Sequence, residues 1–149
     1  MRQADVQTPF GDLTVTEEDG AITRITWGVS GRADRSPVLD ETVAQLQAYD
    51  SGALERFDLP LNVRGSQLQR DVCAAMLDIP FGHTVTYGDI AKRLDVPAQA
   101  VGQACGGNPI PIVIPCHRVM GAKGLTGFSG AGGVETKVAL LRHEGGFLI

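Results

Sequence analysis

The chain has 149 residues, of which 43% are hydrophobic, and its formal net charge is −4. This length suits one domain of ordinary size or two small ones. Residues 110–114 form the longest apolar stretch, which is far too short to span a bilayer, and residues 1–13 lack the apolar core of a signal peptide. Neither a membrane protein nor an exported protein is therefore expected.

The charge is divided unevenly between the two halves of the chain. Residues 1–62 carry five Lys or Arg against eleven Asp or Glu, whereas residues 63–149 carry eight against six. A polyanionic partner is therefore expected to bind the second half, although an excess of two positive charges is a weak signal by itself.

The three cysteines, Cys73, Cys105 and Cys116, show no paired spacing. Unpaired cysteines in odd number favour a reducing compartment, here the cytoplasm, over a disulfide framework. Together with the three histidines they form no C-x-x-C or H-x-x-x-H pattern, so the sequence predicts no structural zinc site.

The first third of the chain predicts a small antiparallel sheet followed by a helix. Short segments rich in Val, Ile and Thr, separated by turns containing Gly and Asp, predict strands at residues 3–7, 13–16 and 21–27. Ser36-Pro37 is typical of a helix start, and residues 50–52 of a helix end. The expected buried face of this helix is Leu39, Val43 and Leu46. Residues 57–64 then predict an extended connector.

Three further helices are predicted after this connector. Gly65-Ser66 opens the first, whose expected inner side is Leu68, Val72, Ala75, Met76 and Ile79. Thr86 is expected to cap the second, because its hydroxyl can accept the amide of Asp89 three residues later. A tight turn at residues 95–97 precedes the third, at residues 98–105. Two short helices across a three-residue turn form a helix-turn-helix.

The helix at residues 98–105 has unusually small side chains. Its small residues are Ala98, Ala100, Gly102 and Ala104, and its only polar side chains are Gln99 and Gln103. Such a helix suits close approach to something narrow, such as a DNA minor groove about 6 Å wide. Small residues also allow tight packing against a neighbouring helix, and the helix alone favours this simpler interpretation.

Residues 108–119, Asn-Pro-Ile-Pro-Ile-Val-Ile-Pro-Cys-His-Arg-Val, place a cysteine directly before a histidine and an arginine. The three prolines exclude a long helix or a central strand, so we expect an extended, buried approach to a fixed turn. The thiol of Cys116 would lie beside two potential cations, which favour the thiolate. An inert core cysteine fits the Cys-His adjacency equally well.

A glycine-rich segment and a final helix follow the cysteine. Residues 120–133 contain six glycines and Ser129, and suggest a flap over a pocket rather than a phosphate-binding loop. The last helix is predicted at residues 134–144, with the core stripe Val134, Val138 and Leu141. Glu144 stands at the edge of this stripe in the last turn, where a carboxylate opposes the helix dipole. It either pairs with His117 or faces solvent.

These residues together resemble a known family. Pro115-Cys116-His117-Arg118-Val119, preceded by Gly107-Asn108-Pro109, is similar to the active-site motif of the O6-alkylguanine-DNA alkyltransferases, also called methylated-DNA–protein-cysteine methyltransferases. Residues 85–91, 100–102, 127–130 and 140–145 resemble further motifs of that family. The resemblance is detailed over residues 63–149, whereas residues 1–62 match only in length and in strand-then-helix order.

The resemblance implies an α/β (α+β) fold with two domains. Residues 1–62 would form a small ribonuclease H-like domain, an antiparallel sheet plus a helix. Residues 63–149 would form a mainly helical C-terminal domain that carries the helix-turn-helix and the active site.

The resemblance also implies a mechanism without a cofactor. The Cys116 thiolate would attack the alkyl carbon on O6 of guanine, and His117 would take the thiol proton through a water while Glu144 orients the imidazole. Tyr87 would donate a proton to the guanine ring, and Asn108 would brace the strand before the cysteine. Because the thioether is not cleaved, each molecule would act once.

Duplex DNA is the implied partner of a monomeric protein. The helix-turn-helix would bind the minor groove and rotate the damaged guanine out of the stack. Ser129 would contact O6, and the carbonyls of Cys116 and Val119 would accept the exocyclic amine. The expected DNA contacts are Thr86, Ala98, Gln99, Ala100, Gly102, Gln103 and Arg118.

The chain departs from the family pattern at several positions. Gln99 stands where the family usually has an arginine that fills the gap left by the rotated base, and the turn before it is shorter. Cys73 replaces a common tryptophan, and Phe128 a frequent tyrosine. Two other functions therefore stay open: a non-catalytic protein that recognises alkylated bases and marks them for another pathway, and an unrelated Cys-His-Glu hydrolase.

Overall fold

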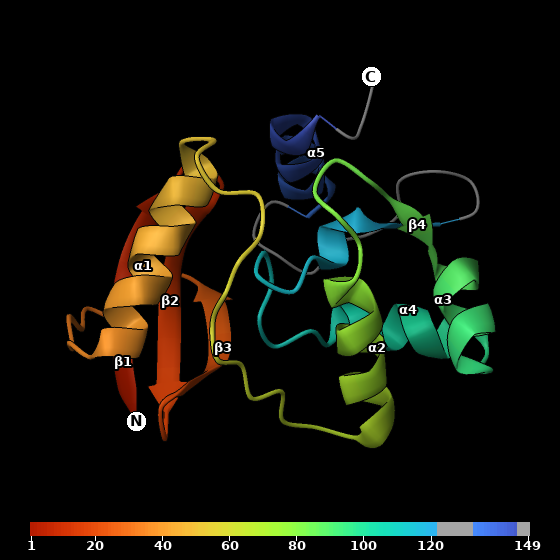
Figure 1. The fold of residues 1–149 in the computed structure, drawn as a ribbon, viewed down its shortest axis with the longest axis horizontal. Coiled ribbons are helices and arrows are strands. Elements are labelled where there is room, and N and C mark those ends of the chain that lie inside the picture. Colours follow the sequence, from red (N-terminus) through yellow and green to blue (C-terminus); the bar gives the residue numbers. More distant parts are fainter. Residues whose placement is uncertain (122–132, 146–149) are drawn as a thin grey trace. The chain divides into compact units, whose positions relative to one another are not determined.

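The computed structural model describes residues 1–121 and 133–145, and the chain forms two compact units, Met1–Val63 and Arg64–Ile149. Figure 1 colours and labels their elements along the sequence. The mixed α/β class expected from the sequence is confirmed. No helix in the described ranges is long and apolar enough to cross a membrane.

The first unit contains an antiparallel sheet whose strands follow the order β1-β2-β3. The strands are β1 (Arg2–Thr8), β2 (Gly11–Glu18) and β3 (Ala21–Trp27). Asp19 and Gly20 join β2 to β3 with φ values of 53° and 80°, the backbone that a tight two-residue hairpin turn requires. The predicted three-stranded meander is therefore confirmed.

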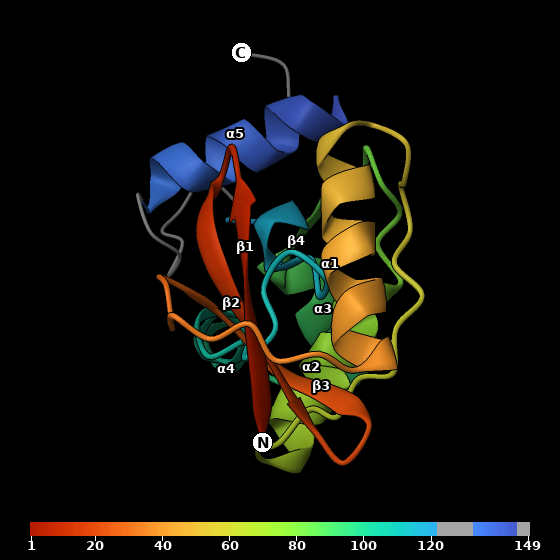
Figure 2. The same ribbon diagram turned by 90° about the vertical axis from the view of Figure 1, so that its left-hand side faces the viewer.

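Helix α1 (Pro37–Asp50) packs against this sheet (Figure 2). It begins where predicted, because the Ser36 hydroxyl accepts the Leu39 amide at 3.0 Å. Its buried residues are Leu39, Thr42, Leu46 and Tyr49. The predicted Val43 is only half-buried, since the 3.6-residue period places it at the edge of this stripe.

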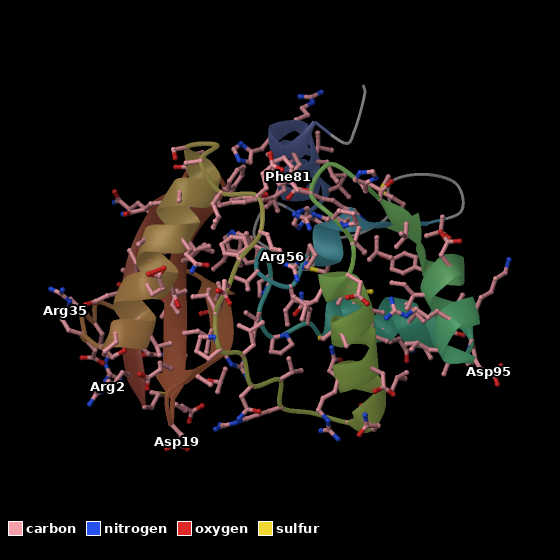
Figure 3. The ribbon with its side chains drawn as sticks, in the orientation of Figure 1. Arg2, Asp19, Arg35, Arg56, Phe81 and Asp95 are labelled. Atoms are coloured by element: carbon pink, nitrogen blue, oxygen red, sulfur yellow. The ribbon has the colours of Figure 1, made fainter. Side chains whose placement is uncertain are left out.

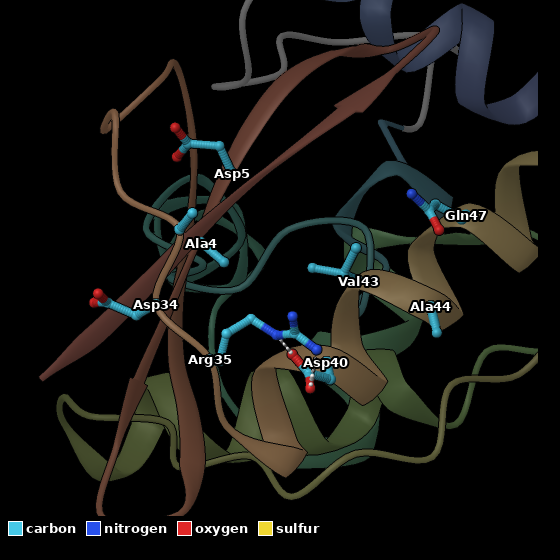
Figure 4. Close-up of a pocket in the computed structure, with 9 residues that line it drawn as sticks. Ala4, Asp5, Asp34, Arg35, Asp40, Val43, Ala44 and Gln47 are labelled. Carbon is cyan, nitrogen blue, oxygen red and sulfur yellow. Dashed lines mark hydrogen bonds and ion pairs between the residues drawn. The ribbon is translucent and has the colours of Figure 1, made fainter.

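A hollow of about 350 Å³ lies between β1, residues 33–35 and α1 (Figure 4). Arg35 and Asp40 form an ion pair on its rim, with 2.8 Å between Nε and Oδ1 and side chains 81% and 46% exposed. Solvent screens such an exposed pair. The lining offers carboxylates and a guanidinium but neither cysteine nor histidine, so the hollow holds no thiol that could accept an alkyl group.

The second unit is mainly helical in its described part. Its helices are α2 (Gln67–Leu77), α3 (Tyr87–Leu94), α4 (Ala98–Gly106) and α5 (Val134–Glu144). Two short strands, β4 (Val85–Thr86) and β5 (Val119–Met120), pair in parallel, and a 3-10 turn, η1 (Cys116–Arg118), precedes β5.

Helices α3 and α4 form the predicted helix-turn-helix. The Thr86 hydroxyl accepts the Asp89 amide at 3.1 Å, and the Asp89 carboxylate accepts the Thr86 amide at 2.9 Å, so both halves of the capping box are present. Asp95, labelled in Figure 3, ends α3 with a φ of 55°, and Pro97 leads directly into α4.

Helix α5 has the predicted bounds but a different buried face. Val134 is 41% exposed and Val138 is half-buried, so two members of the predicted stripe do not belong to the core. The buried residues are Thr136, Lys137, Leu140, Leu141 and Glu144. The helix has turned polar side chains inward, which hydrophobic periodicity cannot predict.

Candidate active site

The segment that delivers Cys116 is folded into tight turns. The Val113 amide donates to the Pro111 carbonyl at 2.9 Å, and the Cys116 amide donates to the Ile114 carbonyl at 2.8 Å. Each bond spans two residues, and Ile112, inside the first turn, has a φ of 71°. Left-handed backbone is strained for a β-branched residue, and such strain clusters at functional sites. The expected extended approach is therefore wrong, although its burial is confirmed.

Asn108 holds this turn segment at two points. Its side-chain nitrogen donates to the Ile114 carbonyl at 2.8 Å, and its side-chain oxygen accepts the Ile110 amide at 3.0 Å. The prolines of the segment have no amide hydrogen to donate. The Asn108 side chain thus supplies bonds that fix the backbone just before the cysteine.

Cys116 begins the 3-10 turn and is 6% exposed. Burial raises the pKa of its thiol, against the smaller lowering effects of a hydrogen bond from Asn108 and of the Lys137 ammonium. The resting group is therefore the thiol. The expectation that His117 and Arg118 would favour the thiolate is wrong, because burial dominates and both side chains bind Glu144.

His117 is fully buried beside Glu144, with its Nε2 atom 2.7 Å from Oε2 of the carboxylate. A carboxylate only accepts, so Nε2 carries the proton and Nδ1 presents a lone pair. Nδ1 is buried without a hydrogen-bond partner among the described residues. Burial lowers the pKa of His117, although Glu144 opposes this effect. The neutral imidazole can therefore accept a proton at Nδ1.

Glu144 also binds Arg118. Nε of Arg118 donates to Oε1 at 2.7 Å and Nη2 donates to Oε2 at 2.9 Å, while Nη1 donates to the Ile79 carbonyl at 2.7 Å. The guanidinium lies 5.9 Å from the ring centroid of Phe81, which is labelled in Figure 3. Glu144 is 5% exposed, which excludes the solvent-facing alternative. Arg118 is 6% exposed, so the predicted DNA contact by Arg118 does not fit the structure.

Tyr87 is the first residue of α3 and directly follows β4. In the β4–β5 ladder, Val85 lies opposite Val119 and Thr86 lies opposite Met120. The strand that leaves the cysteine turn is thus paired with the strand that leads into Tyr87. This ladder fixes the half-buried tyrosine relative to the turn that carries Cys116.

Helix α4 presents uncharged side chains to solvent. Its buried residues are Val101, Ala104 and Cys105, whereas Ala98, Gln99 and Gln103 are exposed and Ala100 is half-buried. A Cβ added at Gly102 would meet no heavy atom within 4 Å. Packing against a neighbouring helix therefore explains Ala104 but not Gly102, where open space favours the groove-binding interpretation.

Lys137 is a buried charge that sequence reasoning missed. It is 1% exposed, and its ammonium donates to the Val119 carbonyl at 2.7 Å. Residues seven apart share one face of a helix, so the spacing of Lys137 and Glu144 was a signal that the apolar stripe concealed. The Val119 carbonyl, expected to accept the guanine amine, keeps a second lone pair for that role.

Ser129 and the Gly-Phe-Ser-Gly loop at residues 127–130 lie outside the described residues. Within the described ranges, no group of three or more His, Cys, Asp or Glu side chains is placed to hold a metal ion.

Two family models match the chain. The model described as 6-O-methylguanine DNA methyltransferase, ribonuclease-like domain, matches residues 1–63, and the model for the DNA binding domain matches residues 67–146. A methylated-DNA–protein-cysteine methyltransferase of Mycolicibacterium paratuberculosis is 43% identical over 149 residues, which cover 93% of this chain and 89% of that protein.

Two solved structures from Mycobacterium tuberculosis are similar over nearly the whole chain. The crystal structure of its O6-methylguanine methyltransferase gives a TM-score of 0.86 at 37% identity and covers 99% of this chain and 94% of that one. The crystal structure of its OGT in complex with DNA gives a TM-score of 0.87 at 38% identity, with 97% and 93% covered.

Proposed function

The chain belongs to the 6-O-methylguanine DNA methyltransferase family, and from this premise we propose how its residues carry out repair. The protein is a methylated-DNA–protein-cysteine methyltransferase: it repairs DNA by moving the alkyl group from O6 of guanine to one of its own cysteines. DNA is its partner. We assign Cys116 as the acceptor and residues 63–149 as the domain that holds the site.

The first step is removal of the thiol proton from Cys116. His117 is neutral, its Nε2–H is engaged by Glu144, and Nδ1 is the ring atom left to accept. A buried nitrogen of this kind calls for a polar partner. One water bridging the thiol and Nδ1 would satisfy it and carry the proton, and Glu144 would stabilise the imidazolium that forms.

The second step is an in-line displacement at the alkyl carbon. A lone pair of the Cys116 sulfur forms the new S–C bond as the C–O6 bond breaks, and the electrons of that bond go to the guanine ring. Tyr87 donates its phenolic proton to the ring, so guanine leaves as a neutral base. The protein keeps a thioether, which no group in the described site can cleave, and it therefore acts once without a cofactor.

DNA binding is assigned to the helix-turn-helix. Thr86, Ala98, Gln99, Ala100, Gly102 and Gln103 are the proposed contacts, with α4 in the minor groove. Gln99 is exposed near the start of α4 and would fill the place of the guanine that is rotated out of the stack. Its amide can hydrogen-bond with the unpaired cytosine.

The remaining assignments complete the pocket. Asn108 fixes the turn segment, the Cys116 and Val119 carbonyls accept the exocyclic amine of guanine, and Ser129 contacts O6. The protein is proposed to act as a monomer in the cytoplasm, where the free thiols would stay reduced.

The observation that carries this assignment is that His117, next to Cys116 in the chain, has one imidazole nitrogen bound to Glu144 and the other buried without a hydrogen-bond partner among the described residues. Incubating the protein with a duplex that contains O6-methylguanine and measuring the intact protein mass tests it. One methyl increment per molecule is expected, absent in Cys116→Ser and retained in Cys73→Ala and Cys105→Ala.

The same experiment decides the alternative. Gln99, in place of an arginine, is the feature that favours a protein that only recognises the lesion. Tight binding to the modified duplex without a mass increment would establish that alternative, and an increment that survives in Cys116→Ser would overturn the assignment of the acceptor.

A further inference from the structure

Lys137 carries a positive charge in the interior, and none of the described residues offers it a carboxylate. The residue is 1% exposed, and within the described residues the hydrogen-bond partner of its ammonium is the neutral Val119 carbonyl. Glu144, on the same helix, instead binds His117 and Arg118. A buried ammonium is costly unless it is paired. Lys137 therefore lowers the stability of the fold, and its presence calls for another explanation.

The position of Lys137 along α5 adds to this cost. A helix dipole favours anions in the first turn and cations in the last turn. The outer face of α5 obeys this rule, with Glu135 in the first turn and Arg142 in the last. The inner face reverses it, because buried Lys137 lies in the first turn and buried Glu144 ends the helix. Only the charges directed at the cysteine turn break the rule.

Lys137 is connected to Cys116 through one residue. The Val119 amide donates to the Cys116 carbonyl and closes the 3-10 turn, while the Val119 carbonyl accepts the Lys137 ammonium at 2.7 Å. The ammonium is thus fixed beside the turn that carries the sulfur. The two groups also act on each other: Lys137 lowers the pKa of the Cys116 thiol, and Cys116 raises the pKa of Lys137 against the larger effect of burial.

We propose that Lys137 is a positioning residue for alkyl transfer, which supplies the fixed positive charge that balances the Cys116 thiolate after its proton has passed to His117. The proposal rests on the proposed role of Cys116 as acceptor. Lys137 forms no bond to the substrate and keeps its protons throughout. Its effect is electrostatic, and it is strong because the surroundings exclude water.

The charged or titratable groups that act on Cys116 and Lys137 come from several elements. Cys73 of α2 acts on Cys116, and Cys105 of α4 acts on Lys137. Lys137 in turn opposes the protonation of His117, which shares the Glu144 carboxylate with Arg118. Cys73 opposes the ionisation of Cys116, Cys116 opposes that of Cys105, and Arg118 is matched by Glu144. Lys137 is the cation in this set that no carboxylate matches among the described residues.

Two substitutions separate the charge from the hydrogen bond. Lys137→Gln keeps a donor for the Val119 carbonyl and loses the charge, whereas Lys137→Met loses both. Single-turnover rates are measured from pH 6 to pH 10 with a free O6-alkylguanine nucleobase, so that DNA binding does not contribute. Arg142→Met, which removes an exposed cation from the same helix, is the matched control.

Both Lys137 variants are expected to react roughly 10- to 100-fold more slowly at pH 7 and to recover rate as the pH rises, because an adjacent cation lowers a thiol pKa by about one to two pH units. Their Tm should equal or exceed that of the unaltered protein, since an unbalanced buried charge has gone. Arg142→Met should keep both the rate and the profile.

Three results would overturn the proposal: a Lys137→Gln profile identical to that of the unaltered protein, full rate in Lys137→Gln with loss only in Lys137→Met, or loss of the fold in both. The first result would show that Lys137 has no role in alkyl transfer, and the other two would show that its role is structural. If the unaltered protein takes up no alkyl group, the proposed function itself fails, which is a separate outcome.

Discussion

Helices α4 and α5 belong to the same unit and distribute polarity in opposite ways. α4 turns apolar residues inward and leaves its outer surface nearly bare, with Gln99 and Gln103 as its long exposed side chains. α5 exposes Val134 and buries Lys137 and Glu144. α4 thus lacks the positive charge that is common on a DNA-binding surface, although we propose that it contacts DNA, and α5 has charged side chains in the core, where apolar ones are usual.

The starts of the helices show the same division. α1, α2 and α3 each begin with a side-chain cap, from Ser36, Ser66 and Thr86, whereas Pro97 and Gly133, which precede α4 and α5, provide no such cap. α1 and α2, which build the scaffold, obey the local rules of helix formation, and so does α3. The helix proposed to enter the minor groove, α4, and the helix that carries Lys137 and Glu144, α5, do not. Departures of this kind are expected where function competes with stability.

The largest effect should come from removing the proton acceptor that α5 holds in place. His117→Asn is expected to slow alkyl transfer roughly 10²- to 10⁴-fold at neutral pH, because no base then takes the thiol proton. The rate should recover partly at alkaline pH, where hydroxide can do so. Single-turnover kinetics of methyl uptake measure this, and His83→Asn, an exposed histidine, is the control.

The depressed pKa of His117 also predicts how stability depends on pH. Because the folded pKa lies below the unfolded value of about 6.5, the unfolded chain binds the proton more readily. The stability contributed by neutral His117 is therefore present above about pH 6.5 and is lost as the pH falls through the lower folded pKa. Urea titrations at several pH values should show this loss in the unaltered protein and less of it in His117→Asn.

Glu144→Gln removes the negative charge from the buried face of α5. The substitution leaves the buried Arg118 without its anion and is expected to cost about 3–5 kcal/mol of unfolding free energy. Glu135→Gln, on the exposed first turn of the same helix, should cost far less. Chemical denaturation of both variants makes the comparison, and equal losses would contradict the assigned ion-pair network.

Gln99→Arg adds a positive charge to the exposed surface of α4. A cation and a longer wedge at this exposed position should tighten binding to duplex DNA by roughly 3- to 10-fold and steepen the salt dependence by about one counterion. Gln103→Arg adds the same charge one turn later on the same helix. Binding titrations at several salt concentrations compare them, and a faster repair rate is expected only for Gln99→Arg. An equal gain from both would show that charge alone matters.

The smallest effect is expected in the scaffold. Ser66→Ala removes the hydroxyl that accepts the Gln69 amide at 3.1 Å and should cost about 1 kcal/mol of stability. Alkyl transfer by the folded variant should be unchanged. Thermal unfolding and single-turnover kinetics, measured side by side, check whether scaffold and site are as separable as the helix starts suggest.

The sequence predicted the scaffold well because its signals are local. The strand segments, the Ser36 and Thr86 caps and the three-residue turn before α4 depend on residues next to one another, and the structure confirms them. The sequence also predicts the pairing of His117 with Glu144 as one of two options, the other being a solvent-facing Glu144, because a carboxylate in the last turn of a helix opposes the helix dipole and favours a positively charged or imidazole partner.

The misses come from side-chain bonds to backbone or to other side chains, which residue patterns do not indicate. The turn at Ile112 depends on Asn108 reaching Ile110 and Ile114, which proline statistics alone do not indicate. The burial of Lys137 depends on a carbonyl eighteen residues away, and the burial of Arg118 on Glu144. Hydrophobic periodicity assigns every charged residue to the surface. It is therefore wrong for charged residues that point into an active site.

The most direct test locates the transferred group. The protein is reacted once with a duplex whose O6-methylguanine carries a deuterated methyl group, then digested, and the peptides holding Cys73, Cys105 and Cys116 are sequenced by tandem mass spectrometry. The label should appear on Cys116 alone, in an amount equal to the guanine restored in the DNA. Label on either of the other thiols, or guanine restored without label on the protein, would contradict the account.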